Sequence, residues 1–388
     1  MARPARVLFA IPELNAGGPD RVVHELICGL DRTEFLPLLA VAKPGGRYFA
    51  ALPRDVEVHV TGGGRYPVWR FAKAVDALRP DLVFTTLRMN VTASLAGFFQ
   101  RWRPPHVARQ ANAMAADFAQ LKKTSLLKHR VAEQVVRRLI RMPDVLVAQS
   151  SDMAAELAPF ATPRQRIVAI GNPVSLADID AARAAQAAVG RRRVRGNPSL
   201  VAVGRLAPQK GFDLLLPAFA RLLATHPDAV LTIFGEGPEL PALEALVREL
   251  GIGGSVQLAG QSDRILAEVA AADLFVSSSR YEGFSNAILE AMALGRPVVV
   301  TDCVGATKDM VEDEKTGILV PPGSAAALEA GLRRALEIDR RAIGEAARRH
   351  VGTAFSRDGI AAAYAALFRS VLVHPERPAR GGWRNRLP

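Results

Sequence analysis

Residues 278–300 read SSRYEGFSNAILEAMALGRPVVV, which predicts a glycine-containing loop, a helix that begins near Ser285 or Asn286, and a buried strand after Gly295. Ser and Asn are favoured at helix starts because their side chains accept hydrogen bonds from the first backbone amides. In a sheet of parallel strands such a helix begins at the carboxyl edge, where its amides can point at a bound anion. The segment therefore predicts an α/β fold with a phosphate site at this loop.

The same order of strand, loop and helix recurs along the chain of 388 residues. Short runs rich in Val, Ile and Leu alternate with longer stretches of helical periodicity, which is typical of parallel sheets covered by helices on both faces. We expect strands at 7–11, 38–42, 82–86, 106–109, 145–149 and 167–170 in the first half, and at 200–203, 230–234, 256–258, 274–277, 297–301 and 318–320 in the second. The pattern predicts two Rossmann-like, doubly wound α/β domains.

The length of the chain exceeds what one hydrophobic core usually supports, so two domains of ordinary size are expected. We place an N-terminal domain at 1–175, a basic linker region at 176–198 and a C-terminal domain at 199–355. A last helix at about 356–373, capped by Ser356 or Asp358, is expected to complete the N-terminal domain. The tail at 374–388, rich in Pro, Gly and Arg, is expected to be disordered.

The formal net charge of +12 indicates a polyanionic partner, which could be nucleic acid, an anionic membrane surface or a phosphorylated small molecule. The two cysteines, Cys28 and Cys303, lie far apart and in no CxxC pattern. A disulfide framework or a zinc module is therefore not expected, and a reducing cytoplasm fits best. No window approaches the roughly 18 apolar residues that span a bilayer, so any membrane association is expected to be peripheral.

Two carboxylates in the 278–300 segment could address different hydroxyl groups of one extended ligand. Glu282 lies in the loop and Glu290 in the helix that follows. Carboxylate oxygens are good acceptors for hydroxyl groups. Taken alone, a pair at this spacing is most often two solvated surface residues, so the surrounding sequence has to decide between the two interpretations.

Residues 201–213, VAVGRLAPQKGFD, also follow an expected strand and open a helix. Arg205 offers a planar fork for a phosphate and Lys210 a compact ammonium group. Together they could neutralise the charge that accumulates on a departing diphosphate. An ordinary surface pair beside a helix start is the alternative interpretation.

Glycines mark two further junctions between a strand and a helix. Gly235 and Gly237 follow the strand expected at 230–234, and Gly17 and Gly18 follow the strand expected at 7–11. Glycine permits a close approach of the backbone to a phosphate or a sugar. A simple turn is the alternative, because glycine turns after strands are common in α/β proteins.

These segments resemble the GT4 family of retaining glycosyltransferases, also called glycosyl transferases group 1. The match comprises the Glu-x7-Glu signature at 282–290, the flanking EAMAxGxPVV at 290–299, and the Gly-Arg and Lys-Gly pairs at 204–205 and 210–211. It extends over most of the chain and is much stronger in the second half. The resemblance implies the GT-B fold, in which two Rossmann-like domains face each other across a cleft.

The resemblance also implies roles for the site residues. Glu282 would contact the donor hexose and act with Arg205 and Lys210 in catalysis, and Glu290 would bind the ribose hydroxyls. Backbone amides of Phe284, Ser285 and Asn286 would meet the sugar and the diphosphate. Gly17 and Gly18 would face the donor from the first domain, and Gly235 and Gly237 would line the donor site in the second.

Arg109 and Asn112 come at the end of the strand expected at 106–109, where many family members have a histidine that this sequence lacks. They resemble a substitute found in some polysaccharide-type members, which implies contact with a sugar or an acceptor. A structural pairing of Arg109 with a carboxylate is an equal alternative.

Most of the excess positive charge is concentrated between Arg101 and Arg141. This segment holds ten basic and two acidic residues, a balance of +8, interleaved with apolar residues. Such a pattern is typical of a basic amphipathic helix that docks on an anionic membrane, and a solvated basic face is the alternative. Nucleic acid is not expected as a partner, since no stacking motif, zinc module or recognition-helix pattern is found.

The resemblance implies a reaction that keeps the configuration of the donor sugar, with the leaving phosphate accepting the acceptor proton. The donor loops hold no Asp-x-Asp pair for a divalent cation, so we predict a metal-independent enzyme without a cofactor. A UDP-sugar is the expected donor, and a glycan or lipid-linked molecule in cell-surface polysaccharide or glycolipid synthesis the expected acceptor. The protein is expected on the cytoplasmic face of the plasma membrane.

Three other functions are weighed against this one. A nucleotide-sugar epimerase could use the same architecture. A phosphorylase would need a lysine that carries pyridoxal phosphate, and the sequence offers no such context. A non-enzymatic protein that binds polyanions is disfavoured because Arg205, Lys210, Glu282 and Glu290 are present together.

Overall fold

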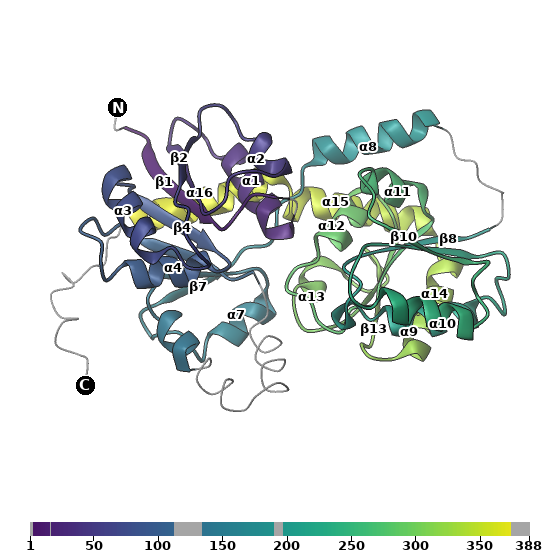
Figure 1. Cartoon of the computed structure of the whole chain (residues 1–388). Coiled ribbons are helices and arrows are strands. Elements are labelled where there is room, and N and C mark those ends of the chain that lie inside the picture. Colours follow the sequence, from purple (N-terminus) through teal and green to yellow (C-terminus); the bar gives the residue numbers. More distant parts are fainter. Residues whose placement is uncertain (1–2, 16, 112–133, 190–196, 374–388) are drawn as a thin grey trace.

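The computed structural model describes residues 3–15, 17–111, 134–189 and 197–373. It contains two α/β domains that lie side by side, each built on a parallel sheet (Figure 1). The predicted tail at 374–388, part of the predicted linker, and most of the predicted basic segment lie outside the described residues. The two doubly wound domains agree with the predicted fold class.

The first sheet has seven strands in the order β3-β2-β1-β4-β5-β6-β7. Their bounds are β1 (Ala5–Ile11), β2 (Phe35–Val41), β3 (Glu57–Val60), β4 (Leu82–Thr86), β5 (His106–Arg109), β6 (Val145–Ala148) and β7 (Arg166–Ala169). The helices that accompany it are α1 (Gly18–Gly29), α2 (Arg47–Ala50), α3 (Val68–Leu78), α4 (Met89–Ala96), α7 (Ser151–Leu157) and α16 (Arg357–Val373).

The second sheet has six strands in the order β10-β9-β8-β11-β12-β13. Their bounds are β8 (Ser199–Val203), β9 (Val230–Phe234), β10 (Val256–Gly260), β11 (Leu274–Ser277), β12 (Val298–Thr301) and β13 (Ile318–Val320). The helical elements around it are α8 (Leu176–Val189), η1 (Pro208–Lys210), α9 (Phe212–Leu222), α10 (Leu240–Glu249), α11 (Ile265–Ala271), α12 (Asn286–Ala293), α13 (Thr307–Met310), α14 (Ala325–Glu337) and α15 (Arg340–Ala354).

In both sheets the strand order reverses direction beside the first strand of the domain. β1 pairs with both β2 and β4, and β8 pairs with both β9 and β11. The loops that leave two such neighbouring strands diverge to opposite faces of the sheet, and this opens a crevice at their carboxyl ends where ligands bind in α/β folds. The Gly17-Gly18 loop follows β1, and the 204–211 and 278–285 loops follow β8 and β11.

The predicted strands all occur, with bounds that differ by at most a few residues, but β3 was not predicted. Its sequence, EVHV, alternates polar and apolar residues, and every residue of it is at least partly exposed. β3 lies at the edge of the sheet and pairs with β2 alone. Edge strands need fewer apolar residues than buried central ones, so a search for runs of Val, Ile and Leu does not detect them.

The C-terminal helix α16 returns to pack on the first sheet (Figure 1). The ring of Phe368 lies 6.3 Å from that of Phe9, 6.0 Å from that of Phe35 and 6.0 Å from that of Phe84, measured between centroids. Phe368 and Tyr364 are fully buried. The last helix of the chain therefore contributes to the core of the first domain.

The chain crosses between the domains twice, and the two crossings lie against each other. The backbone amide of Val174 donates to the carbonyl of Phe355 (2.9 Å), and the amide of Arg357 donates to the carbonyl of Val174 (2.9 Å). These bonds satisfy backbone groups that would otherwise be left unpaired in a buried connection. They tie the segment after β7 to the start of α16.

We predict that Phe368→Ala lowers the free energy of unfolding by about 3–5 kcal/mol, because it leaves a cavity between α16 and the first sheet. Phe98→Ala is the matched control, since Phe98 is 55% exposed and should cost less than about 0.5 kcal/mol. Urea denaturation of both variants measures the difference. Equal stabilities would show that α16 contributes nothing to this core.

Candidate functional site

The loops after β8 and β11 meet at the carboxyl edge of the second sheet. The ammonium group of Lys210 forms an ion pair with the carboxylate of Glu282, and the Ser279 hydroxyl donates to the same carboxylate (2.7 Å). The side chains of Lys210 and Glu282 are only 18% and 8% exposed. The two residues come together because β8 and β11 are neighbours in the sheet, although they are 72 positions apart in sequence.

The second acidic residue of the signature is paired across the two domains. The guanidinium of Arg21, on α1, forms an ion pair with the carboxylate of Glu290, on α12. Their side chains are 13% and 16% exposed. Removing two charges from water costs free energy that their mutual attraction has to offset. A ligand hydroxyl or phosphate that enters here therefore finds a carboxylate and a cation already in place.

The Gly17-Gly18 loop is held by Asp20. The Asp20 carboxylate accepts from the backbone amides of Gly17 (3.0 Å) and Asn15 (3.1 Å). Burial raises the pKa of this carboxyl above its ordinary value, and the two amide hydrogen bonds act in the opposite direction. A Cβ atom on Gly18 would lie 3.1 Å from the side-chain nitrogen Nδ2 of Asn286. Glycine at this position therefore lets α1 of the first domain approach the start of α12 in the second.

A row of hydrogen bonds connects the core of the first domain with the start of α12. Arg109 donates from its guanidinium to Asn172 Oδ1 (2.5 Å), and Asn172 Nδ2 donates to Asn286 Oδ1 (2.7 Å). Asn286 Nδ2 in turn lies 3.4 Å from the carbonyl oxygen of Gly18. Since each amide uses its oxygen on one side and its nitrogen on the other, the buried cation fixes the orientation of both amides.

Arg109, which the sequence predicts to contact a sugar or an acceptor, is a buried residue in this structure, and that contact stays a prediction. Arg109 is 1% exposed and lies against Thr86, Asn172 and Tyr364. Burial lowers the pKa of its guanidinium and raises that of the neighbouring Tyr364 phenol. The alternative prediction is a pairing of Arg109 with a carboxylate. Among the described residues its three contacts are uncharged, so no such pairing is seen there. Asn112 lies outside the described residues.

The other predicted residues of the second domain surround the same edge. Arg205 is exposed between β8 and η1. Ser285 occupies the position before α12, but its hydroxyl accepts no capping bond in this structure. The ring of Phe284 packs edge-on against that of Phe355, 5.7 Å away. The start of α12 lies beside the Gly17-Gly18 loop, since Asn286 Nδ2 is 3.4 Å from the carbonyl oxygen of Gly18.

Gly235 and Gly237 have a packing reason to be glycine. A Cβ atom on Gly235 would lie 1.9 Å from the carbonyl oxygen of Gly204, and one on Gly237 would lie 2.2 Å from that of Leu206. Gly235 also has φ +143°, which favours glycine. The loop after β9 therefore packs tightly beside the loop that carries Arg205 and Lys210.

Arg21 and Ser279 were not identified from the sequence. Arg21 lies three residues after Gly18 and therefore one turn into α1, which is the only local signal for it. The family resemblance places the Gly17-Gly18 loop across the cleft from the loop before α12, but nothing in the sequence indicates that Arg21 pairs with Glu290, 269 positions away. Within the described residues no group of three His, Cys, Asp or Glu is placed to hold a metal ion, and metal independence stays a prediction.

Two family descriptions match the chain. "Glycosyl transferase 4-like domain" matches residues 17–173, and "Glycosyl transferases group 1" matches residues 191–350. The glycogen synthase of Mycobacterium tuberculosis is 34% identical over 93% of this chain and 93% of that protein. An exopolysaccharide phosphotransferase of Streptomyces coelicolor is 35% identical over 47% of this chain, but the match spans only 20% of that longer protein.

Solved structures share the fold. HepE from Anabaena, solved in complex with UDP, superposes with a TM-score of 0.76 at 20% identity, covering 94% of this chain and 100% of that one. The likeness extends over both sheets. It agrees with the prediction of two Rossmann-like domains that face each other.

We predict that Glu290→Gln opens the two domains in the absence of ligand, because the variant leaves Arg21 without its charged partner. A group left unpaired in this way costs about 1–3 kcal/mol. Small-angle X-ray scattering should show a larger radius of gyration. The control is Glu329→Gln, whose partner Arg333 lies on the same helix, α14. Identical scattering from both variants would mean that the Arg21–Glu290 pair does not hold the domains together.

Proposed function

Because the chain belongs to the GT4 family of glycosyltransferases, the glycosyl transferases group 1, we propose that it transfers a hexose or N-acetylhexosamine from a UDP-sugar with retention of configuration. The observation that carries the proposal is the meeting of Lys210, Glu282, Glu290 and the start of α12 opposite the Gly17-Gly18 loop. The complex of the structural neighbour HepE with UDP supports the choice of nucleotide.

In this proposal the two glutamates bind the two ends of the donor. Glu290 accepts hydrogen bonds from the ribose hydroxyls, and the Arg21 cation is then released from its ion pair toward the diphosphate. Glu282 accepts from hydroxyls of the transferred sugar. The backbone amides of Phe284, Ser285 and Asn286 face the phosphates, as the partly positive start of α12 favours.

The cationic side chains of Arg205 and Lys210 act in the catalytic step. The bond between the anomeric carbon and the diphosphate oxygen breaks, and the diphosphate gains negative charge. Arg205 and Lys210 stabilise that charge. The acceptor hydroxyl attacks the anomeric carbon from the face that the diphosphate leaves, and its proton passes to a diphosphate oxygen. No separate base and no metal ion are needed in this scheme.

We place Lys210 at the centre of this step because its ammonium already lies against Glu282. The ion pair keeps both groups in position while they are largely removed from water. A diphosphate that enters beside them competes for the ammonium group, and Ser279 continues to donate to Glu282. The carboxylate is thereby left oriented toward the sugar hydroxyls.

The acceptor in this proposal is a glycan or a lipid-linked molecule in polysaccharide or glycolipid synthesis. The names of the relatives, an exopolysaccharide phosphotransferase and a glycogen synthase, support a polysaccharide product. The net charge of +12 supports work at the anionic inner face of the plasma membrane. Each helix that the structure describes is too short or too polar to span a bilayer. The unpaired cysteines Cys28 and Cys303 support a reducing compartment.

We predict that Arg205→Ala and Lys210→Ala each lower turnover by about 10²–10³, equivalent to roughly 3–4 kcal/mol, by analogy with the removal of one preorganised donor to a developing anion. Affinity for the donor should fall less. Release of UDP from a panel of UDP-sugars, with and without candidate glycan acceptors, measures turnover. Lys315→Ala, at a side chain 76% exposed, is the control and should keep normal turnover.

The proposed function fails if the parent protein binds no nucleotide sugar. A rise in thermal stability with UDP or a UDP-sugar is the simplest sign of binding, since ligands that bind the native state stabilise it. If the parent protein binds and turns over a donor while both variants keep near-normal turnover, the diphosphate site is assigned to the wrong residues.

A further inference from the structure

The exposed aromatic side chains gather in one place on the first domain. In the part of the chain that the structure describes, the strongly exposed aromatic residues are Tyr66 (44%), Trp69 (57%), Phe98 (55%), Phe99 (52%) and Trp102 (39%). They lie at the start of α3, in the loop directly before it (Tyr66), or in the turn at 97–102 between α4 and β5. A gathered group of exposed apolar residues on a protein surface marks a contact site far more often than scattered ones do.

Contacts between the two segments join these residues into a single surface, which we call the aromatic face (residues 65–79 and 97–103). The rings of Trp69 and Phe99 lie 5.0 Å apart between centroids. Further along α3, Asp76 accepts from the backbone amides of Arg101 (2.9 Å) and Trp102 (2.7 Å). The indole nitrogen of Trp102 donates to the carbonyl of Pro80 (2.6 Å). These hydrogen bonds hold the turn at 97–102 against α3, while its aromatic rings stay exposed.

The aromatic face is strongly basic. Its two segments hold six basic residues and one acidic residue, Asp76, and the carboxylate of Asp76 is engaged by the two amides named above. The six basic residues, all exposed, are Arg65, Arg70, Lys73, Arg79, Arg101 and Arg103. Two of them lie over aromatic rings, Arg65 over Tyr66 at 5.7 Å and Arg79 over Trp102 at 5.8 Å.

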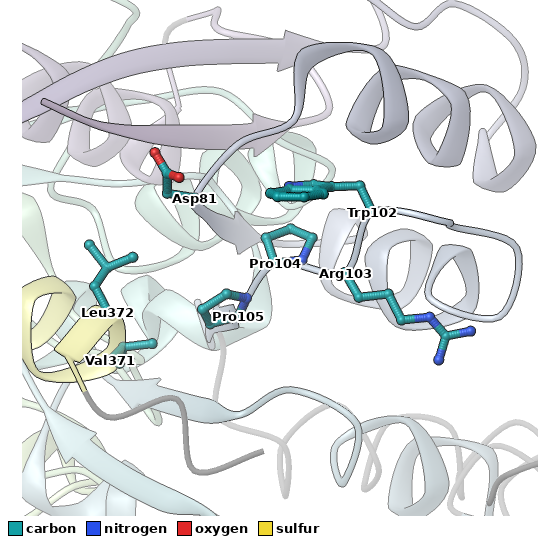
Figure 2. Close-up of a pocket in the computed structure, with 7 residues that line it drawn as sticks. All are labelled: Asp81, Trp102, Arg103, Pro104, Pro105, Val371 and Leu372. Atoms are coloured by element: carbon teal, nitrogen blue, oxygen red, sulfur yellow. The ribbon is translucent and has the colours of Figure 1, made fainter. Parts of the chain in front are cut away.

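This surface lies away from the donor loops. α3 is on the side of the first domain remote from the second domain (Figure 1). The pocket beside Trp102 is lined by Asp81, Arg103, Pro104, Pro105, Val371 and Leu372 (Figure 2). Asp81, Pro104 and Pro105 precede β4 and β5, so the pocket opens at the amino edge of the sheet. The start of α3 follows the carboxyl end of β3, but β3 is the outermost strand of the sheet and α3 is remote from the second domain (Figure 1), so the aromatic face leaves the cleft accessible.

We propose that the aromatic face docks the protein on an anionic lipid bilayer. Trp and Tyr rings are suited to the boundary between headgroups and hydrocarbon because each has an apolar body and a polar edge. Phe98 and Phe99 supply the apolar side chains that enter the acyl region, and the basic side chains around them meet the lipid phosphates. Long Arg and Lys stems can lie along the apolar surface while their charges stay in water.

The exposed rings of the aromatic face fit a bilayer better than nucleic acid. Nucleic acid would be bound by a groove that follows its backbone, whereas α3 and the neighbouring turn present rings that are themselves more than a third exposed. The membrane association that is part of the proposed function is thereby assigned to residues 65–79 and 97–103. Of these, only 101–103 belong to the predicted basic segment at 101–141.

Co-sedimentation of the full chain with vesicles tests the proposal. Vesicles of phosphatidylcholine with phosphatidylglycerol should bind the protein at low salt and release it at high salt, and vesicles of phosphatidylcholine alone should bind it weakly.

Arg70→Gln with Lys73→Gln should weaken binding about thirtyfold, from the usual contribution of two basic residues near an anionic surface. Trp69→Ser with Phe99→Ser should weaken it at least tenfold. Val304→Ser, at a side chain 60% exposed in the second domain, and Arg341→Gln, on α15, are the controls.

Tryptophan fluorescence gives a second readout. The chain has three tryptophans, and in a variant with Trp102→Phe and Trp383→Phe the emission should report Trp69 alone. Anionic vesicles should shift this emission to shorter wavelength, and lipids brominated along the acyl chain should quench it. An unchanged emission spectrum with bound vesicles would show that Trp69 does not enter the bilayer.

Several outcomes would overturn the proposal. One is vesicle binding that persists in the α3 variants but is lost when Lys122, Lys123, Arg137 and Arg138 become Gln, which would assign docking to the predicted basic segment. Another is a loss of binding to single-stranded RNA, and not to vesicles, in the same α3 variants. UDP binding by the Trp69→Ser, Phe99→Ser variant separates this test from the proposed function, since it should be unchanged whether or not the aromatic face docks on lipid.

Discussion

The site depends on one constraint of parallel sheets, which is that all strands present their carboxyl ends at the same edge. In each domain this edge receives the loops after the central pair of strands, β1 with β4 and β8 with β11. Residues far apart in sequence, such as Lys210 and Glu282, are brought into contact because their strands are neighbours. The two crossings near Val174 and Phe355 hold the two edges opposite each other. The contact of Arg21 with Glu290 follows from that placement.

The two glutamates of the cleft are each balanced by a cation. Glu282 is matched by Lys210 and Glu290 by Arg21, and all four side chains are largely buried. An uncompensated charge in such a place would be costly, so the two buried glutamates need cationic partners. One of these partners comes from the other domain, which couples the state of the site to the arrangement of the domains. The row of hydrogen bonds from the Arg109 guanidinium through Asn172 to Asn286 adds a directional link between the first domain and the start of α12.

The first domain has two surfaces of interest, the cleft residues and the aromatic face. Its carboxyl edge provides the Gly17-Gly18 loop and Arg21 to the cleft. The turn at 97–102 precedes β5 and so belongs to the amino edge, where it joins α3 in the basic and aromatic surface. The proposed function requires the protein to bind a lipid surface and a nucleotide sugar together. The aromatic face and the cleft use different residues of the first domain, so the two surfaces do not compete.

The sequence by itself determined the α/β class, nearly all strands, and the loops that carry Arg205, Lys210, Glu282 and Glu290, because these features are encoded in local periodicity and in short contiguous motifs. It could not provide the polar edge strand β3, the burial of Arg109, or the role of Arg21. Arg109 reads locally as a polar residue at a strand end, and only the packing of α16, with Tyr364 against it, encloses it. Arg21 becomes a partner of Glu290 only when α1 and α12 meet across the domains. The aromatic face likewise exists because α3 and the 97–102 turn pack together. The local sequence determines whether a segment forms a helix, a strand or a loop. Contacts between segments that are distant in the chain depend on how the whole chain buries its apolar surface, so only the tertiary structure decided them.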